Sequence, residues 1–140
     1  CIRDRPHSVR NRITLASLPT HDVEENAAIV NALQRHAAVI VQKSLREGFG
    51  LTVTEGMWKH RPVVATRVGG IQDQIEDGIS GVLLDDPTDR NEFAAALLGL
   101  LEDPGRAERL GRAAQQRARD FFLCNRHFRQ YITLLLQIDG

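Results

Sequence analysis

The amino-acid sequence predicts an α/β fold, a Rossmann-like parallel sheet flanked by helices, with a helical C-terminal tail. Short apolar runs alternate with segments of helical periodicity along residues 13–85, and this alternation is typical of a parallel sheet with crossover helices. The clearest apolar run, residues 38–41 (AVIV), is short and rich in β-branched side chains, as buried parallel strands are. After Pro87 only helical patterns follow, so we expect packing helices to complete the domain.

The expected elements up to residue 85 are short. Residues 1–12 are expected to form an irregular, solvated or non-native lead, because Asp4 and Pro6 interrupt its arginines. The expected strands are residues 13–16, 38–41, 62–66 and 81–85. The expected helices are residues 23–36, a segment from Leu51 or Thr52, and residues 71–76, with the glycine pair at 69–70 as a simple strand-to-helix turn.

Three further helices are expected in the C-terminal part. Asp89 and Glu92 have the spacing of a capping box and open the first of them. An Asp-Pro pair at 103–104 separates it from the second, at residues 106–122. The third, at residues 125–137, carries its apolar side chains on one side. We expect this apolar face to pack in the core; the alternative is that it is left partly uncovered.

Composition indicates one soluble domain in a reducing compartment. The 140 residues have a formal net charge of zero and 42% hydrophobic content, and a chain of this size buries roughly two-thirds of its unfolded surface. We therefore expect no nucleic-acid partner, and no apolar run approaches the roughly twenty residues of a membrane span. Cys1 and Cys124 are far apart and the five histidines do not cluster with them. We expect no disulfide framework, no metal site and no cofactor, and a cytoplasmic location.

The most informative segment lies between the second expected strand and the helix that follows it. Gly48 and Gly50 allow a tight loop and close approach of a ligand to the backbone, at the edge where open α/β sheets bind ligands. Phe49 between them is expected to anchor the loop in the core. The start of the helix leaves N–H groups free at its positive end, which binds phosphate well. Glu47 and Glu55 lie on either side of this turn.

Simpler interpretations of these residues stay open at this point. Glu55 has capping-box spacing from Thr52 and could serve only as the reciprocal cap of the helix. Glu47 and Lys43 could be solvated loop side chains, although Lys43 could also neutralise phosphate. The two glycines lack the third glycine of a dinucleotide fingerprint. The combination is therefore more informative than any one of its members.

Several phrases, in order along the chain, closely resemble retaining glycosyltransferases of family 4. They are residues 44–51 (SLREGFGL), 55–57 (EGM), 62–66 (PVVAT), 68–70 (VGG), 76–78 (EDG) and 81–84 (GVLL). The resemblance implies the GT-B fold, in which two Rossmann-like domains face each other across a cleft and the C-terminal one holds the donor. It implies that residues 13–140 are part of that C-terminal domain. The partner would then be the missing N-terminal GT-B domain, and we expect the fragment alone to be inactive.

The resemblance also implies roles for the residues at the turn. Glu47 would be the catalytic residue, beside the hydroxyls of the donor sugar and its reacting carbon. The backbone N–H groups would hold sugar hydroxyls and the distal phosphate, and Glu55 would accept hydrogen bonds from the ribose. Retention in this family is explained by same-face attack, so the two acids are not a glycosidase pair. The implied donor-binding residues are Phe49, Gly50, Leu51, Thr52 and Glu55, with Lys43, Gly48 and Leu18, the last against the base, as further candidates.

Within that family, residues 41–53 (VQKSLREGFGLTV) and 58–59 (WK) resemble the branch of trehalose synthase and trehalose phosphorylase. The synthase implies transfer of a hexosyl, here glucosyl, group from UDP- or ADP-glucose to an acceptor sugar. The phosphorylase implies glucose 1-phosphate and no nucleotide. A non-catalytic nucleotide-sugar-binding module is an alternative from another class, and a sugar-nucleotide epimerase has less support.

Overall fold

The computed structural model describes residues 4–138. The chain divides into two compact units at the boundary between Ala32 and Leu33. The first unit holds α1 (His7–Arg10) and most of α2 (Val23–His36). Within it, the Asp22 carboxylate accepts the Glu25 amide at 2.9 Å, and the Asn26 side chain donates to the Pro19 carbonyl at 2.8 Å. These bonds fix the start of α2, and the helix predicted at 23–36 is confirmed.

The strand predicted at residues 13–16 is wrong. These residues have no regular secondary structure and are exposed, with Leu15 at 79%. A strand is stable only when its backbone groups pair with a neighbour and one face is covered. A short run of strand-forming residues carries no information on whether such a neighbour exists.

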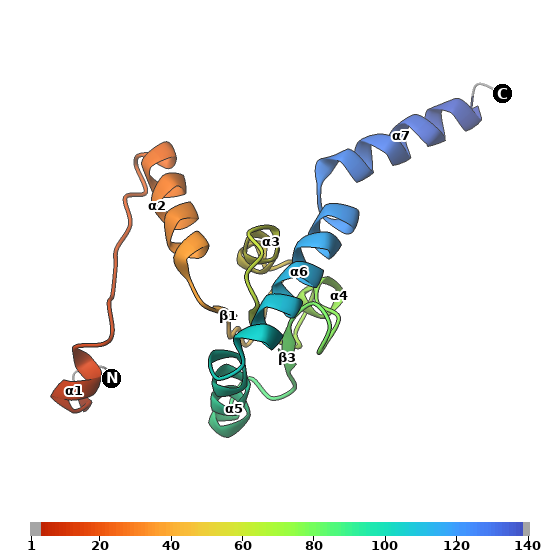
Figure 1. Cartoon of the computed structure of the whole chain (residues 1–140). Helices are drawn as coiled ribbons and strands as arrows, with labels where there is room; N and C mark the ends of the chain where they lie inside the picture. Colours follow the sequence, from red (N-terminus) through yellow and green to blue (C-terminus); the bar gives the residue numbers. More distant parts are fainter. Residues whose placement is uncertain (1–3, 139–140) are drawn as a thin grey trace. The chain divides into compact units, whose positions relative to one another are not determined.

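The second unit contains a three-stranded parallel sheet in the order β1-β2-β3, whose outer strands β1 and β3 are labelled in Figure 1. The strands are β1 (Ile40–Gln42), β2 (Val63–Thr66) and β3 (Val82–Leu84). Two crossover helices join them, α3 (Leu51–Trp58) between the first pair and α4 (Ile71–Gln74) between the second. The predicted parallel sheet and both crossovers are confirmed, with ends shifted by one or two residues.

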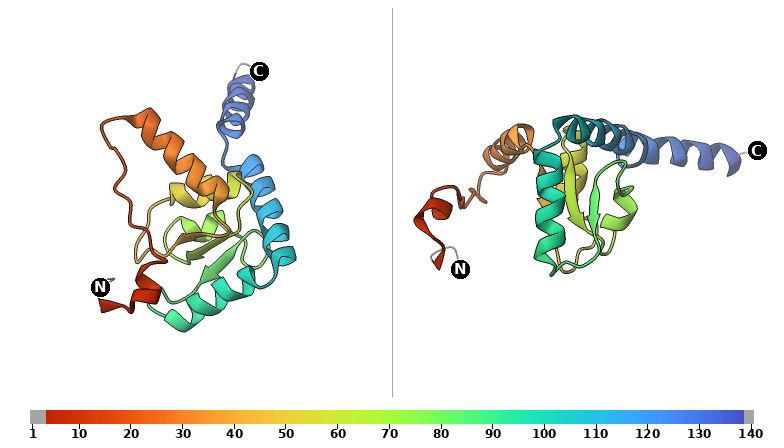
Figure 2. Two further views of the ribbon diagram at one scale, coloured as in Figure 1. Left: turned by 60° about the vertical axis from the view of Figure 1, so that its left-hand side comes forward. Right: turned by 60° about the horizontal axis from the view of Figure 1, so that its bottom comes forward.

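Helices cover both faces of this sheet. On one face the core contains Ile40, Val53, Met57, Val63, Ala65, Ile71, Ile75, Leu83, Ala114 and Ala118. On the other face it contains Val64, Leu84, Leu100 and Leu110. In the right-hand view of Figure 2 the strands lie between α4 on one side and α5 (Arg90–Leu101) on the other. The long helix α6 (Pro104–Phe121) contributes buried residues to both cores, so its packing stabilises the helices on both faces of the sheet.

The predicted starts of the last helices are largely confirmed. The Asp89 side chain accepts the amides of Asn91 and Glu92, at 2.7 and 3.1 Å, and so caps α5. Glu92 does not complete a capping box, because its carboxylate accepts the amides of Asp85 and Asp86 instead. The next helix, α6, starts at Pro104, two residues before its predicted start, because Asp103 caps it.

The final helix, α7 (Cys124–Ile138), is present as predicted, but the large apolar side chains at positions 128–136 are not buried. Phe128, Ile132 and Leu135 are between 41% and 67% exposed. The expectation that this face packs in the core is therefore wrong, since helical periodicity shows that a face is apolar but not what covers it. No helix within residues 4–138 is both long enough and apolar enough to cross a membrane.

Candidate functional site

The site predicted from the sequence is built on the loop that joins β1 to α3. Gly50 ends this loop in the left-handed region, at φ 75° and ψ 63°, and α3 begins at Leu51. A side chain on Gly50 would stand 3.0 Å from the Ile71 side chain, so only glycine makes this turn without strain. No side chain caps the first turn of α3. The capping-box interpretation of Thr52 and Glu55 is therefore wrong, because Gly50 sets the start of the helix.

A second glycine pair supports this loop from the carboxyl end of β2. The Gly70 amide donates to the Gly48 carbonyl at 2.8 Å. A Cβ on Gly69 would lie 1.7 Å from the Glu47 carbonyl oxygen, and one on Gly70 would lie 2.4 Å from the Gly48 oxygen. The pair is thus more than the simple turn predicted for it, because it lets two backbone segments touch. Its only signal in the sequence was two adjacent glycines after a strand.

Glu47 is half-buried and held by several donors. Its Oε2 accepts from the Gln42 side-chain amide at 3.1 Å and from the Ser44 hydroxyl at 3.4 Å. Its Oε1 accepts the Gly48 amide at 3.1 Å. The interpretation of Glu47 as a solvated loop acid is therefore wrong, and the carboxylate is oriented at the carboxyl end of β1. The sequence places Gln42 at the carboxyl edge of the sheet, where open α/β sheets bind ligands, but no role was predicted for its side chain.

Glu55 is exposed on α3 and is engaged by a different partner. Its Oε2 accepts from the Gln34 side-chain amide at 2.7 Å. Gln34 is only 7% exposed, and its own oxygen accepts from the Lys59 ammonium at 2.6 Å. A buried glutamine held at both ends fixes the direction of the Glu55 carboxylate. Sequence reasoning missed Gln34, because nothing local connects it to Glu55.

Two cations at the same edge of the sheet are held by partners of their own. Lys43 donates to the Pro87 carbonyl, and its ammonium lies 5.7 Å from the centroid of the Phe93 ring. It is half-buried, so the interpretation as a solvated lysine is wrong. Arg67 donates to Asp85 at 2.6 Å and to Asp77 at 3.1 Å. The hydrogen bond to Asp85, more than the one to Asp77, raises the pKa of Arg67.

The other predicted residues are surface-facing. Phe49 is 46% exposed and meets Phe122 edge-on, with ring centroids 6.0 Å apart. The expectation that it anchors the loop in the core is wrong, because its ring packs against the end of α6 instead. Leu51 and Thr52 are exposed at the start of α3. Leu18 is half-buried in the first unit.

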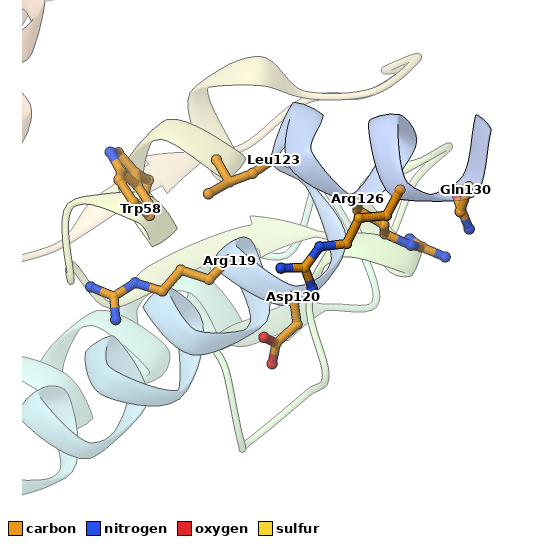
Figure 3. A pocket seen from close by; sticks show the side chains of 7 residues that line it. Trp58, Arg119, Asp120, Leu123, Arg126 and Gln130 are labelled. Atoms are coloured by element: carbon orange, nitrogen blue, oxygen red, sulfur yellow. The ribbon is translucent and has the colours of Figure 1, made fainter. Parts of the chain in front are cut away.

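A separate pocket of about 500 Å³ lies at the other end of α3 (Figure 3). Its lining residues are Trp58, Arg119, Asp120, Leu123, Arg126, Arg129 and Gln130. Two of the arginines lie over aromatic rings, Arg119 over Trp58 at 5.6 Å and Arg126 over Phe121 at 5.3 Å. The pocket is cationic and open, and it contains none of the residues predicted from the sequence.

Comparison with known proteins decides the family. Residues 21–117 match the model of the glycosyl transferases group 1. The chain belongs to this family of glycosyltransferases. The trehalose synthase of Pyrococcus horikoshii is 43% identical over 121 residues, which are 86% of this chain and 28% of that enzyme. The trehalose synthase of Rubrobacter xylanophilus is 48% identical over 111 residues, 79% of this chain and 26% of that one. This glycosyltransferase chain thus spans about a quarter of the length of these relatives.

Solved structures agree with the family assignment. Sucrose-phosphate synthase from Thermosynechococcus elongatus has a TM-score of 0.75 and 30% identity, and covers 94% of this chain and 31% of that one. HepE of Anabaena, in complex with UDP-glucose, has a TM-score of 0.69 and 26% identity, over 77% of this chain and 30% of that one. A C-terminal domain of a group 1 protein from Francisella tularensis, crystallised as a domain, shares the fold at a TM-score of 0.64 and 21% identity. The predicted fold, that of a GT-B C-terminal domain with a helical end, is confirmed.

Proposed function

We propose that this chain forms the donor-binding side of a retaining glycosyltransferase, which moves a glucosyl group from a nucleoside-diphosphate sugar to an acceptor sugar. The observation that carries the proposal is the start of α3, where a left-handed Gly50 precedes the helix and no side chain caps it. The first N–H groups of a helix lack internal partners and lie at the positive end of its dipole. They suit the distal phosphate of a nucleotide sugar.

The two acids suit the two ends of the same donor. Glu47 is held in place by Gln42 and Ser44, and in the proposal it receives hydroxyls of the sugar close to the reacting carbon. Glu55 is held in place by Gln34 and receives the ribose. Adjacent hydroxyls donate readily to one carboxylate, since each of its oxygens accepts more than one hydrogen bond.

Catalysis in this proposal depends on stabilising the leaving group. The bond between the sugar carbon and the phosphate oxygen breaks, and negative charge grows on the departing diphosphate. Fixed N–H donors at the start of α3 stabilise that charge more than they stabilise the bound donor. The acceptor oxygen bonds to the sugar carbon from the same face, and the leaving phosphate takes its proton. Glu47 orients the sugar and forms no covalent bond.

Substrate identity is proposed from the relatives. Proteins named trehalose synthase are 43% and 48% identical to this chain, and HepE has been crystallised with UDP and with UDP-glucose. These similarities support UDP- or ADP-glucose as donor, and a sugar acceptor that yields trehalose. We further propose that residues 13–140 supply the donor wall of the cleft, and that an N-terminal GT-B domain supplies acceptor contacts.

Calorimetry on the 140-residue chain tests the donor site. UDP-glucose, ADP-glucose and glucose 1-phosphate are titrated separately, and one nucleotide sugar is expected to bind at least about tenfold more tightly than glucose 1-phosphate, because only it spans both acids. Binding of glucose 1-phosphate alone would favour the phosphorylase. Binding of no donor would overturn the donor site in this chain.

A further inference from the structure

Gln74 is a buried polar side chain beside the loop that joins β1 to α3. It ends α4 and has no exposed surface. Its side-chain amide Nε2 donates to the carbonyl of Phe49, in the loop before α3. Its backbone is fixed from the other side, because Arg117 of α6 donates to the carbonyls of Gln74 and Asp73 at 2.7 and 2.9 Å. Gln74 therefore connects α6, through its backbone carbonyl, with the loop before α3, through its side chain.

The two atoms of the Gln74 amide are not equally used. Oε1 is buried without a hydrogen-bond partner and lies 3.5 Å from the place of a Cβ on Gly50. If the amide were turned over, Oε1 would face the Phe49 carbonyl, and two acceptors would meet. A buried unpaired oxygen destabilises a fold, whereas an apolar side chain of the same volume does not. Packing alone therefore does not account for a glutamine here.

The bond from Gln74 sets the direction of the next amide. The peptide between Phe49 and Gly50 is trans, so its carbonyl and its N–H point in opposite directions. With the carbonyl held by Gln74, the Gly50 N–H points away from Gln74 and joins the uncapped amides that open α3. Glycine leaves this peptide plane easy to rotate unless something holds it.

We propose that Gln74 is a positioning residue of the donor site: by holding the Phe49 carbonyl it turns the Gly50 N–H toward the distal phosphate of the bound nucleotide. This inference rests on the proposed function. It assigns no contact between Gln74 and the ligand, and its effect is transmitted through one peptide plane.

The test compares UDP with UMP, which lacks the distal phosphate, on the wild-type chain and on Gln74→Met. Methionine keeps the volume and removes the donor. The wild type is expected to bind UDP more tightly than UMP, and the variant is expected to lose about ten- to hundredfold of that preference, the value of one hydrogen bond to a charged group. A merely structural loss would weaken both ligands equally and leave the ratio unchanged.

Leu100→Ala is the matched control, because Leu100 is equally buried but lies in the core on the other face of the sheet. It is expected to lower the melting temperature without changing the ratio. If the wild type prefers UDP and Gln74→Met keeps that preference, the positioning role is overturned and the donor site stands. If the wild type binds neither nucleotide, the proposed function and this inference both fall.

A measurement on the wild type covers the case in which Gln74→Met does not fold. In a ¹⁵N-labelled chain the Gly50 amide resonance is followed during titration with UDP and then with UMP. A large shift with UDP and a small one with UMP is expected, since only UDP carries the distal phosphate. Equal shifts, or none, would overturn the proposed direction of the Gly50 N–H.

Discussion

At the scale of single residues, two glutamine side chains orient the two carboxylates of the candidate site. Gln42 holds the Glu47 carboxylate at 3.1 Å, and Gln34 holds the Glu55 carboxylate at 2.7 Å. A neutral amide fixes a carboxylate without neutralising it, so both acids stay available to hydroxyl groups. The roles proposed for Glu47 and Glu55 depend on this orientation.

Replacing Glu55 with glutamine tests the ribose role directly. Glu55→Gln is expected to weaken UDP-glucose binding about tenfold, because an amide offers one oxygen where the carboxylate offers two. Affinity for glucose 1-phosphate, which has no ribose, is expected not to change. Calorimetry with both ligands checks this, with Glu102→Gln, an exposed acid after α5, as the control. Unchanged affinity for UDP-glucose would contradict the role.

Gly69 and Gly78 both have a positive φ, but only Gly69 lies against another backbone segment. Substitutions at the two positions therefore distinguish the cost of backbone strain from the cost of a steric clash. Gly69 has φ 51° and a Cβ there would strike the Glu47 carbonyl, whereas Gly78 has φ 73° and open space around it. Gly78→Ala is expected to destabilise the chain by about 1 kcal/mol through its backbone angle alone. Gly69→Ala is expected to cost at least about 2 kcal/mol more, because the loop must move. Thermal unfolding measures both, and equal losses would show that the contact does not matter.

At the scale of elements, the two helix starts at Leu51 and Arg90 differ in kind. Asp89 caps α5 with its side chain, while α3 starts after Gly50 with no side-chain cap. The first arrangement gives two amides of α5 a side-chain acceptor, and the second leaves the amides of Leu51 and Thr52 without one, so that a ligand can take them. The cap at α5 stabilises the helix, whereas in our proposal the uncapped start of α3 binds the phosphate of the donor.

Alanine substitutions at these two starts should therefore have different effects on folding. Asp89→Ala is expected to lower the free energy of unfolding by about 1 kcal/mol, because two amides lose their acceptor. Thr52→Ala is expected to change it by less than about 0.5 kcal/mol, because Thr52 caps nothing. Urea denaturation checks both values. A loss at Thr52 as large as that at Asp89 would restore the capping box that the sequence suggests.

These same elements explain which sequence predictions succeeded. The helix at 23–36 and the start of α5 were predictable because periodicity and capping are local. The strand predicted at residues 13–16 was wrong because strand pairing depends on a distant segment. The contact of Gly69 with the Glu47 carbonyl joins parts of the chain that no local pattern connects. The bond from Gln34 to Glu55 spans 21 positions and could not be predicted for the same reason.

At the scale of the whole molecule, the fold brings the loop before α3, the glycine pair after β2 and the end of α4 to one edge of a parallel sheet. Open α/β sheets bind ligands at this edge, and α6 holds the elements together by packing on both faces. The chain spans about a quarter of the length of its trehalose synthase relatives. We therefore propose transfer activity for the complete enzyme and donor binding for this chain.

The most direct test of donor binding is a titration of the ¹⁵N-labelled chain with UDP-glucose. The largest amide shifts are expected on Gly50, Leu51 and Thr52, because their N–H groups meet the phosphate. Residues at the other end of α3, around Trp58, should stay unchanged. Shifts centred on the arginine pocket beside Trp58, or no shifts at all, would contradict the donor site at the start of α3.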